Sequence, residues 1–119
     1  MNRRAGIACA AALLCRAAVA DPSAAEMARI NHLIDAVGAH ADIRFIRNGK
    51  EYSSAQAVEF LHGKLQWRLD KVRTVDDFID QIGTRSTTSG DTYSVRLPSG
   101  KTLPSAEFLR LELARIEGR

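Results

Sequence analysis

Residues 43–52 read Ile-Arg-Phe-Ile-Arg-Asn-Gly-Lys-Glu-Tyr, and this stretch predicts a β-hairpin. Ile43–Arg47 carries the β-branched and aromatic residues of a short strand, and Lys50–Tyr52 returns as a second strand. Asn48-Gly49 lies between them, and a two-residue hairpin turn of type I′ favours this dipeptide because both central positions need a positive φ. The chain therefore contains a sheet, around which the other elements can be arranged.

A first helix is predicted before this hairpin. Ser23 and Glu26 have the spacing of a capping box, in which each side chain accepts a hydrogen bond from the backbone N–H of the other residue. Gly38 is a natural stop for the helix. The apolar residues that recur at helical spacing are Met27, Ile30, Leu33, Ile34 and Val37.

A second helix is predicted directly after the hairpin. Ser53 and Gln56 form another capping-box pair, and we expect the helix to reach about Lys71. Phe60 and Trp67 lie off its apolar stripe, so we expect this helix to be covered on more than one side. The stripe consists of Val58, Leu61, Leu65, Leu69 and Val72.

The second half of the chain repeats the alternation of helix and hairpin. Thr74 is placed to cap a short helix that ends at Gly83. The next segments are a polar loop (84–91), a strand (92–97), a turn (98–100), a return strand (101–103) and a last helix introduced by Pro104 and Ser105. The predicted order is α-β-β-α-α-β-β-α, an α+β fold whose two hairpins can share one antiparallel sheet.

The first 20 residues have the three parts of a cleaved signal peptide. A basic start precedes an apolar run of 11 residues and an Ala-Val-Ala cleavage pattern, so we expect cleavage between Ala20 and Asp21. The apolar run is too short to cross a bilayer, which needs about 20 residues. We therefore predict a periplasmic protein with one domain over residues 21–119 and no membrane span.

Charge and cysteine content change when this segment is set aside. The chain has 17 Lys and Arg against 14 Asp and Glu, but Arg3, Arg4 and Arg16 lie in the first 20 residues. Both cysteines, Cys9 and Cys15, lie there as well. The remainder is neutral, has no thiol, and lacks the basic patch with aromatic residues that a nucleic-acid partner requires.

Two polar segments are candidates for a binding site. The hairpin tip offers Arg47 and Asn48, and Arg47 suits recognition of a carboxylate, although it can also brace a carboxylate within the fold. The Ser/Thr loop can present hydroxyls and backbone N–H groups to an anion or a sugar, but its side chains can also bond the local backbone. The candidate residues are Arg47, Asn48, Ser86, Ser89, Gly90 and Tyr93.

The sequence indicates no catalytic, metal or cofactor site. Of the three histidines, His32 lies near the apolar stripe of the first helix, where we expect it to be packed or to lie at the boundary of the core, and His40 and His62 are expected to be exposed. No pair of them has metal-ligand spacing. Asp76 and Asp77 suit the first turn of a helix, where the dipole favours negative charge.

The chain resembles the YfeK-like family of small proteobacterial periplasmic proteins, a domain of unknown function. The resemblance begins at 45–52, continues through Thr74–Ile79 and Ser86–Gly90, and also includes Ala57, Leu61, Lys64, Tyr93 and Phe108-Leu109. One position departs from it, since Phe60 stands where the resemblance implies a histidine. The resemblance implies export to the periplasm but supplies no activity.

These observations favour a non-enzymatic binding module for an envelope protein or a cell-wall-related ligand. An alternative is an inhibitor or immunity protein that occludes an envelope-targeting hydrolase or toxin with a loop. A third interpretation is a small hydrolase that uses Ser86 or a histidine.

Overall fold

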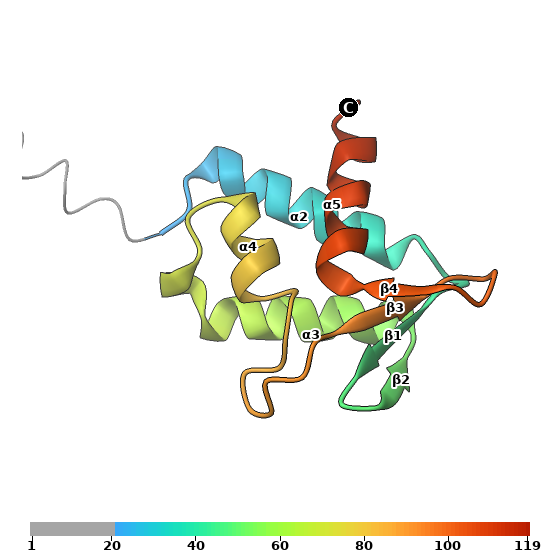
Figure 1. Ribbon diagram of the computed structural model, residues 1–119. Helices are drawn as coiled ribbons and strands as arrows, with labels where there is room; N and C mark the ends of the chain where they lie inside the picture. The colour runs from blue at the N-terminus through green and yellow to red at the C-terminus, as the bar shows by residue number, and fades with distance from the viewer. Residues whose placement is uncertain (1–20) are drawn as a thin grey trace, which may run out of the picture.

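The computed structural model describes residues 21–119, so the predicted signal peptide and Ala20 lie outside the described residues. Within them, four α-helices and four strands follow in the predicted α-β-β-α-α-β-β-α order (Figure 1). The elements are α2 (Ala24–Gly38), β1 (Arg44–Arg47), β2 (Lys50–Tyr52), α3 (Ser54–Trp67), the 3-10 helix η1 (Leu69–Lys71), α4 (Val75–Gln81), β3 (Ser94–Arg96), β4 (Thr102–Pro104) and α5 (Ser105–Ile116).

The two hairpins share one antiparallel sheet, with strand order β2-β1-β3-β4. Phe45 is paired with Tyr52 of β2 on one side and with Val95 of β3 on the other. Asn48 has a φ of 51° and Gly49 one of 79°, as a type I′ turn requires. The sequence-based fold class is confirmed, and so is the turn on which it rests.

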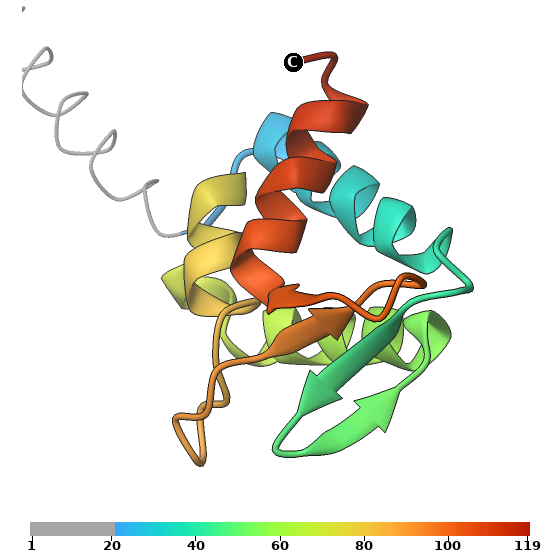
Figure 2. The same cartoon turned by 45° about the vertical axis from the view of Figure 1, so that its right-hand side comes forward.

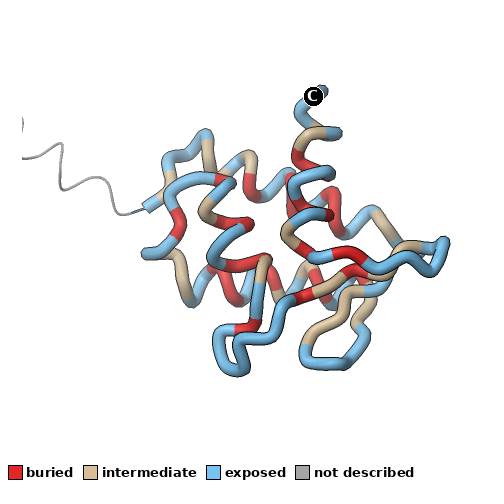
Figure 3. Tube along the Cα trace, in the orientation of Figure 1, coloured by how far each residue is buried: buried red, intermediate tan, exposed pale blue. Residues whose placement is uncertain are grey.

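The core lies between the inner face of this sheet and the helices. Helix α3 packs against β1, and α5 packs against β3 and β4 (Figures 1 and 2). Figure 3 shows the buried positions recurring along the helices that surround this core. Its fully buried large side chains are Phe78, Ile30, Leu33, Ile34, Ile43, Ile79, Ile82 and Leu109, together with Val37, Val72, Val75 and Val95.

The predicted capping box of α2 is only half formed. The Ser23 hydroxyl accepts from the Glu26 N–H at 3.1 Å, as expected. The Glu26 carboxylate, however, accepts from the N–H of Val75 at 2.8 Å and pairs with Arg29 at 3.1 Å. Val75 is the first residue of α4, so Glu26 satisfies a free N–H of another helix and ties the starts of α2 and α4 together.

Two glycines have a different role from the predicted one. Gly38 belongs to α2, whose C-cap is Ala39, and a Cβ on Gly38 would lie 3.0 Å from Val58 of α3. Gly83 follows α4, and a Cβ there would lie 2.4 Å from Leu109. Both glycines therefore allow close contact between helices, and neither has a positive φ.

Two of the predicted elements are shorter in the structure than the sequence pattern indicates. Helix α3 ends at Trp67, and η1 occupies the residues up to Lys71 as a tighter turn. The third strand covers only Ser94–Arg96, although Thr92 makes an isolated bridge with Arg85. Within residues 21–119 there is no helix of the length and apolarity that crossing a bilayer demands.

Two glycine substitutions test the assigned turn. A Cβ on either Gly49 or Gly63 meets nothing within 4 Å, but only Gly49 has a positive φ, while Gly63 lies inside α3. Gly49→Ala should lower the free energy of unfolding by about 1 kcal/mol, and Gly63→Ala should raise it by about 0.5–1 kcal/mol. Denaturant unfolding measures both, and effects of the same sign would contradict the turn.

Candidate functional site

Two neighbouring hollows lie where the tip of the first hairpin, α3 and the Ser/Thr loop meet. The smaller, of about 190 Å³, is mainly apolar and extends inward to Phe45, Leu61 and Leu109. The larger, of about 280 Å³, is lined on one side by Ser86, Thr87 and Thr88 and on the other by α3. Arg47, Phe60 and Tyr93 line both hollows, so the two adjoin, and we call the pair of hollows the groove.

Arg47 enters this groove because of its register in β1. Successive side chains of a strand point to opposite faces, so Arg47 lies on the same inner face as Phe45. Its guanidinium carbon lies 4.7 Å from the centre of the Phe60 ring, a cation–π contact with α3. Phe60 thus forms an aromatic floor beneath Arg47.

The expected carboxylate brace for Arg47 is not found. Within the described residues, Arg47 takes part in no ion pair, and its Nε is buried without a hydrogen-bond partner. Burying a charged donor without a partner costs free energy. In this part of the chain no carboxylate therefore braces Arg47, whose guanidinium instead lies over Phe60 and close enough to the Tyr93 hydroxyl to hold down the pKa of that group.

The Ser/Thr loop is held in one shape by its own hydrogen bonds. Ser86 is buried, its N–H donates to the Asp91 carbonyl oxygen at 2.8 Å, and its carbonyl oxygen accepts from the Gly90 N–H at 2.9 Å. The Ser86 hydroxyl accepts from the Ser89 N–H at 3.3 Å and lies 3.0 Å from the Thr88 hydroxyl. Ser86 and Gly90 thus shape the loop, while the exposed Thr87 and Thr88 face the larger hollow.

A single hydrogen bond joins the loop to the hairpin tip. The Ser89 hydroxyl donates to the side-chain carbonyl oxygen of Asn48 at 2.6 Å, across 41 positions of sequence. Figure 2 shows the two segments projecting side by side from the same end of the molecule. The structure therefore brings all six sequence-predicted residues to one region, although only Arg47, Ser86 and Tyr93 line the groove.

Lys64 is the main residue that sequence analysis did not assign to the site. Only 7% of it is exposed, and its Nζ donates to the Arg85 carbonyl oxygen at 2.7 Å and to the Tyr93 hydroxyl at 2.9 Å. Burial lowers the pKa of Lys64 to about 8, and repulsion from Arg68 and Arg47 adds to the shift. Burial also raises the pKa of Tyr93, and the nearby Arg47 opposes that shift only in part.

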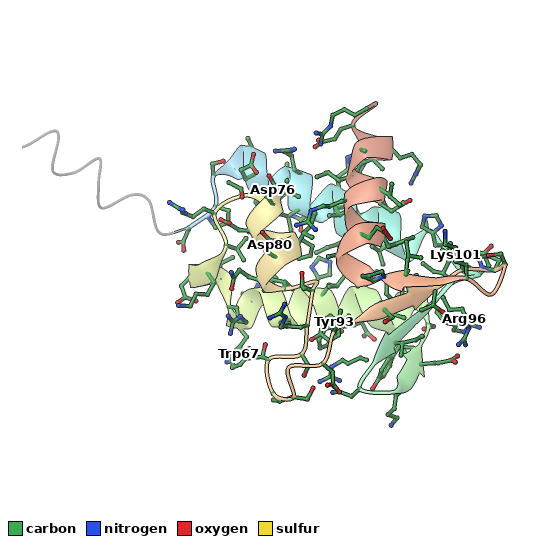
Figure 4. The ribbon with its side chains drawn as sticks, viewed as in Figure 1. Trp67, Asp76, Asp80, Tyr93, Arg96 and Lys101 are labelled. Carbon is green, nitrogen blue, oxygen red and sulfur yellow. The ribbon has the colours of Figure 1, made fainter. Side chains whose placement is uncertain are left out.

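Trp67 is the other unexpected member of the site. The sequence pattern predicts a covered side of α3 for Trp67, whose place on the helix Figure 4 shows, but 68% of this residue is exposed and it lines the larger hollow. The Arg68 guanidinium lies 5.8 Å from its ring centre. An exposed tryptophan beside a groove offers a large, flat contact surface at low cost in conformational entropy.

The histidines lie apart from this arrangement. His32 is exposed, so its predicted packing is wrong, while His62 is exposed as expected. His40 is half-buried, not exposed, because its Nε2 lies 2.8 Å from a carboxylate oxygen of Glu112. In the part of the chain that the structure describes, no three side chains of His, Cys, Asp or Glu gather as metal ligands.

The acidic pair at the start of α4 has a structural role. The Thr74 hydroxyl accepts from the Asp77 N–H at 3.1 Å, and the Asp77 carboxylate accepts from the Arg73 N–H at 3.0 Å. Asp77 thus completes the cap of this helix, as the sequence predicts for Asp76 and Asp77 together.

The fold and groove define a small α+β protein with one preformed, cation-lined groove. Residues 24–117 match a family of unknown function, DUF5329, and the chain belongs to this family. Over 83 residues the chain is 36% identical to the uncharacterized protein YfeK of Salmonella typhimurium. The matched stretch covers 70% of this chain and 69% of that protein. No solved structure matches the chain. The YfeK-like resemblance seen in the sequence is confirmed.

The pKa of Lys64 predicts how stability changes with pH. Its folded pKa of about 8 lies below the ordinary 10.5, so the unfolded chain binds more protons between these values and stability rises with pH there. Above pH 10, the raised pKa of Tyr93 acts in the opposite direction. Denaturant unfolding should therefore give a free energy about 2 kcal/mol higher at pH 10 than at pH 7.

Lys64→Met is the matched control for this effect. Methionine keeps much of the length of the buried stem but does not titrate, so the rise between pH 7 and pH 10 should disappear. An equal rise in both proteins would show that another group causes it.

Proposed function

We propose that the chain is an exported, non-enzymatic binding module of the cell envelope, and that its ligand lies in the groove described above. The ligand is an envelope protein or a cell-wall-related molecule. The observation that carries this proposal is the pair of adjoining hollows that Arg47, Phe60 and Tyr93 line in common, beside the Ser89–Asn48 hydrogen bond that joins the loop to the hairpin tip.

The groove has the composition of a preformed binding site. It combines apolar depth with a few polar groups at its mouth, as ligand sites generally do. The loop is fixed by the bonds of Ser86 and Ser89, so little conformational entropy is lost when a ligand binds. Trp67 and Phe60 add aromatic surface on the α3 side.

The engagement of Ser86 favours binding over hydrolysis at this loop. Its hydroxyl is buried and bonded within the loop, which leaves it unsuited to attack a substrate. His40, the half-buried histidine, bonds to Glu112 of α5 and not to a serine. These contacts support a module that binds without transforming its ligand.

The proposed location rests on the sequence of residues 1–20. Their basic start, short apolar run and Ala-Val-Ala pattern are typical of a signal for export. A chain without cysteine after residue 20 is compatible with an oxidising compartment, since it has no thiol to oxidise there.

A second proposal, an inhibitor or immunity protein, is favoured by the shape of the 84–91 loop. The loop projects beyond the helices and is internally braced, as a segment that enters an active site must be (Figures 1 and 2). Replacing Thr87 and Thr88 by glutamate should then abolish inhibition of any envelope hydrolase that the native protein inhibits. Inhibition that survives both changes would contradict the proposal.

Arg47 and Arg44 provide a matched test of the binding groove. Both lie on β1, but Arg44 occupies the outer face and bonds only to local carbonyl oxygens. Arg47→Ala should reduce retention of the purified protein on isolated cell-wall sacculi or on periplasmic proteins by about tenfold, through loss of a charged contact. Arg44→Ala should leave retention unchanged. Equal retention of both variants and the native protein would contradict the groove.

A further inference from the structure

The groove carries positive charge that the protein itself does not balance. Arg47 and Lys64 lie within it, and Arg68 flanks Lys64 closely enough to lower its pKa. Within residues 21–119, no acidic side chain lines either hollow, and none of these three cations belongs to an ion pair. Elsewhere the protein pairs its charges, for example Arg29 with Glu117 at 2.7 Å and Arg115 with Glu112 at 2.8 Å.

Donors remain available to an anion at this place. Arg47 is only half-buried and lines both hollows, and its guanidinium is a planar fork that matches a carboxylate. Lys64 uses two of its ammonium hydrogens on Arg85 and Tyr93, which fixes its direction and leaves the remaining hydrogen for a ligand. The exposed residues Thr87 and Thr88 line the same hollow as Lys64, and the Thr88 hydroxyl already lies 3.0 Å from the Ser86 hydroxyl.

An apolar compartment of limited size adjoins these donors. Its volume is about 190 Å³, and its inner wall is formed by Phe45, Leu61 and Leu109. An apolar cavity of about 150 Å³ is large enough to hold a benzene ring. The compartment therefore accepts one aromatic or branched aliphatic group, and a long acyl chain exceeds it.

We infer that the groove binds an apolar carboxylate, with its carboxylate between Arg47 and Lys64 and its single aromatic or branched group in the smaller hollow. This inference rests on the proposed binding function and names its ligand class. Phe60 and Tyr93 line both hollows and hold the two halves of such a ligand at a fixed spacing. The carboxylate supplies the counter-charge that the protein lacks there.

A set of matched probes tests each half of the ligand separately. N-acetyl-L-phenylalanine carries both the carboxylate and the apolar group. The corresponding amide, N-acetyl-L-phenylalaninamide, lacks the negative charge, and N-acetylglycine lacks the apolar group. Titration of the exported protein, followed by NMR chemical shifts, should show binding of the first at millimolar concentration. The other two should bind at least about tenfold more weakly.

The variants locate the probe in the groove. Arg47→Ala should weaken binding of N-acetyl-L-phenylalanine about tenfold, and Arg44→Ala should not change it. Arg47→Lys keeps the charge but loses the fork, so its affinity should lie between those of the native protein and Arg47→Ala. Equal affinity for acid and amide, no effect of Arg47→Ala, or no binding of the acid would each overturn the inference.

The source of the carboxylate is settled by two further probes. An acetylated tripeptide that ends in phenylalanine represents the free C-terminus of a polypeptide, and 3-phenylpropanoate represents a small free acid. Tighter binding of the tripeptide assigns the subsite to a polypeptide end, and tighter binding of 3-phenylpropanoate assigns it to a small metabolite. The protein could be retained on envelope material in an Arg47-dependent way and yet bind none of the acids. That result would overturn the inferred ligand class but would still support the proposed binding function.

Discussion

The left-handed backbone at Asn48 and Gly49 decides which side chains of β1 face the helices. A two-residue turn fixes the register of the hairpin, and a slip of one residue would move every side chain of the strand to the opposite face. In the observed register Phe45 enters the core and Arg47 lies over Phe60 of α3. The same turn presents the Asn48 side chain to Ser89, so the contact between the hairpin tip and the Ser/Thr loop depends on it as well.

The buried lysine of the groove lowers the free energy of unfolding of the protein. Lys64 is almost fully buried beside two arginines, and burial of unbalanced positive charge is unfavourable. An apolar residue at that position would suit the buried face of α3, which already contains Ala57, Leu61 and Leu65. Proteins retain such local destabilisation most often at functional sites, because selection for binding or chemistry opposes selection for stability.

Features that depend on neighbouring residues were predictable, and features that join distant residues were not. The type I′ turn and the Ser53–Gln56 capping box are encoded within a few residues, and both form. The Ser89–Asn48 bond and the Glu26–Val75 cap join residues far apart in sequence, so no local pattern signals them. Lys64 had a local indication, since it lies between Leu61 and Leu65 on the buried face of α3, but its burial depends on Arg85 and Tyr93, which are distant in sequence.

We propose that Arg47 serves a ligand rather than the stability of the fold, and the melting temperature of Arg47→Met tests this role most directly. Methionine removes the buried charge but keeps much of the length of the side chain, so the variant should melt at or above the temperature of the native protein. Arg44→Met controls for a change on the outer face of the same strand. A fall of about 4–8 °C for Arg47→Met alone, which corresponds to about 1 kcal/mol in a domain of this size, would contradict the account.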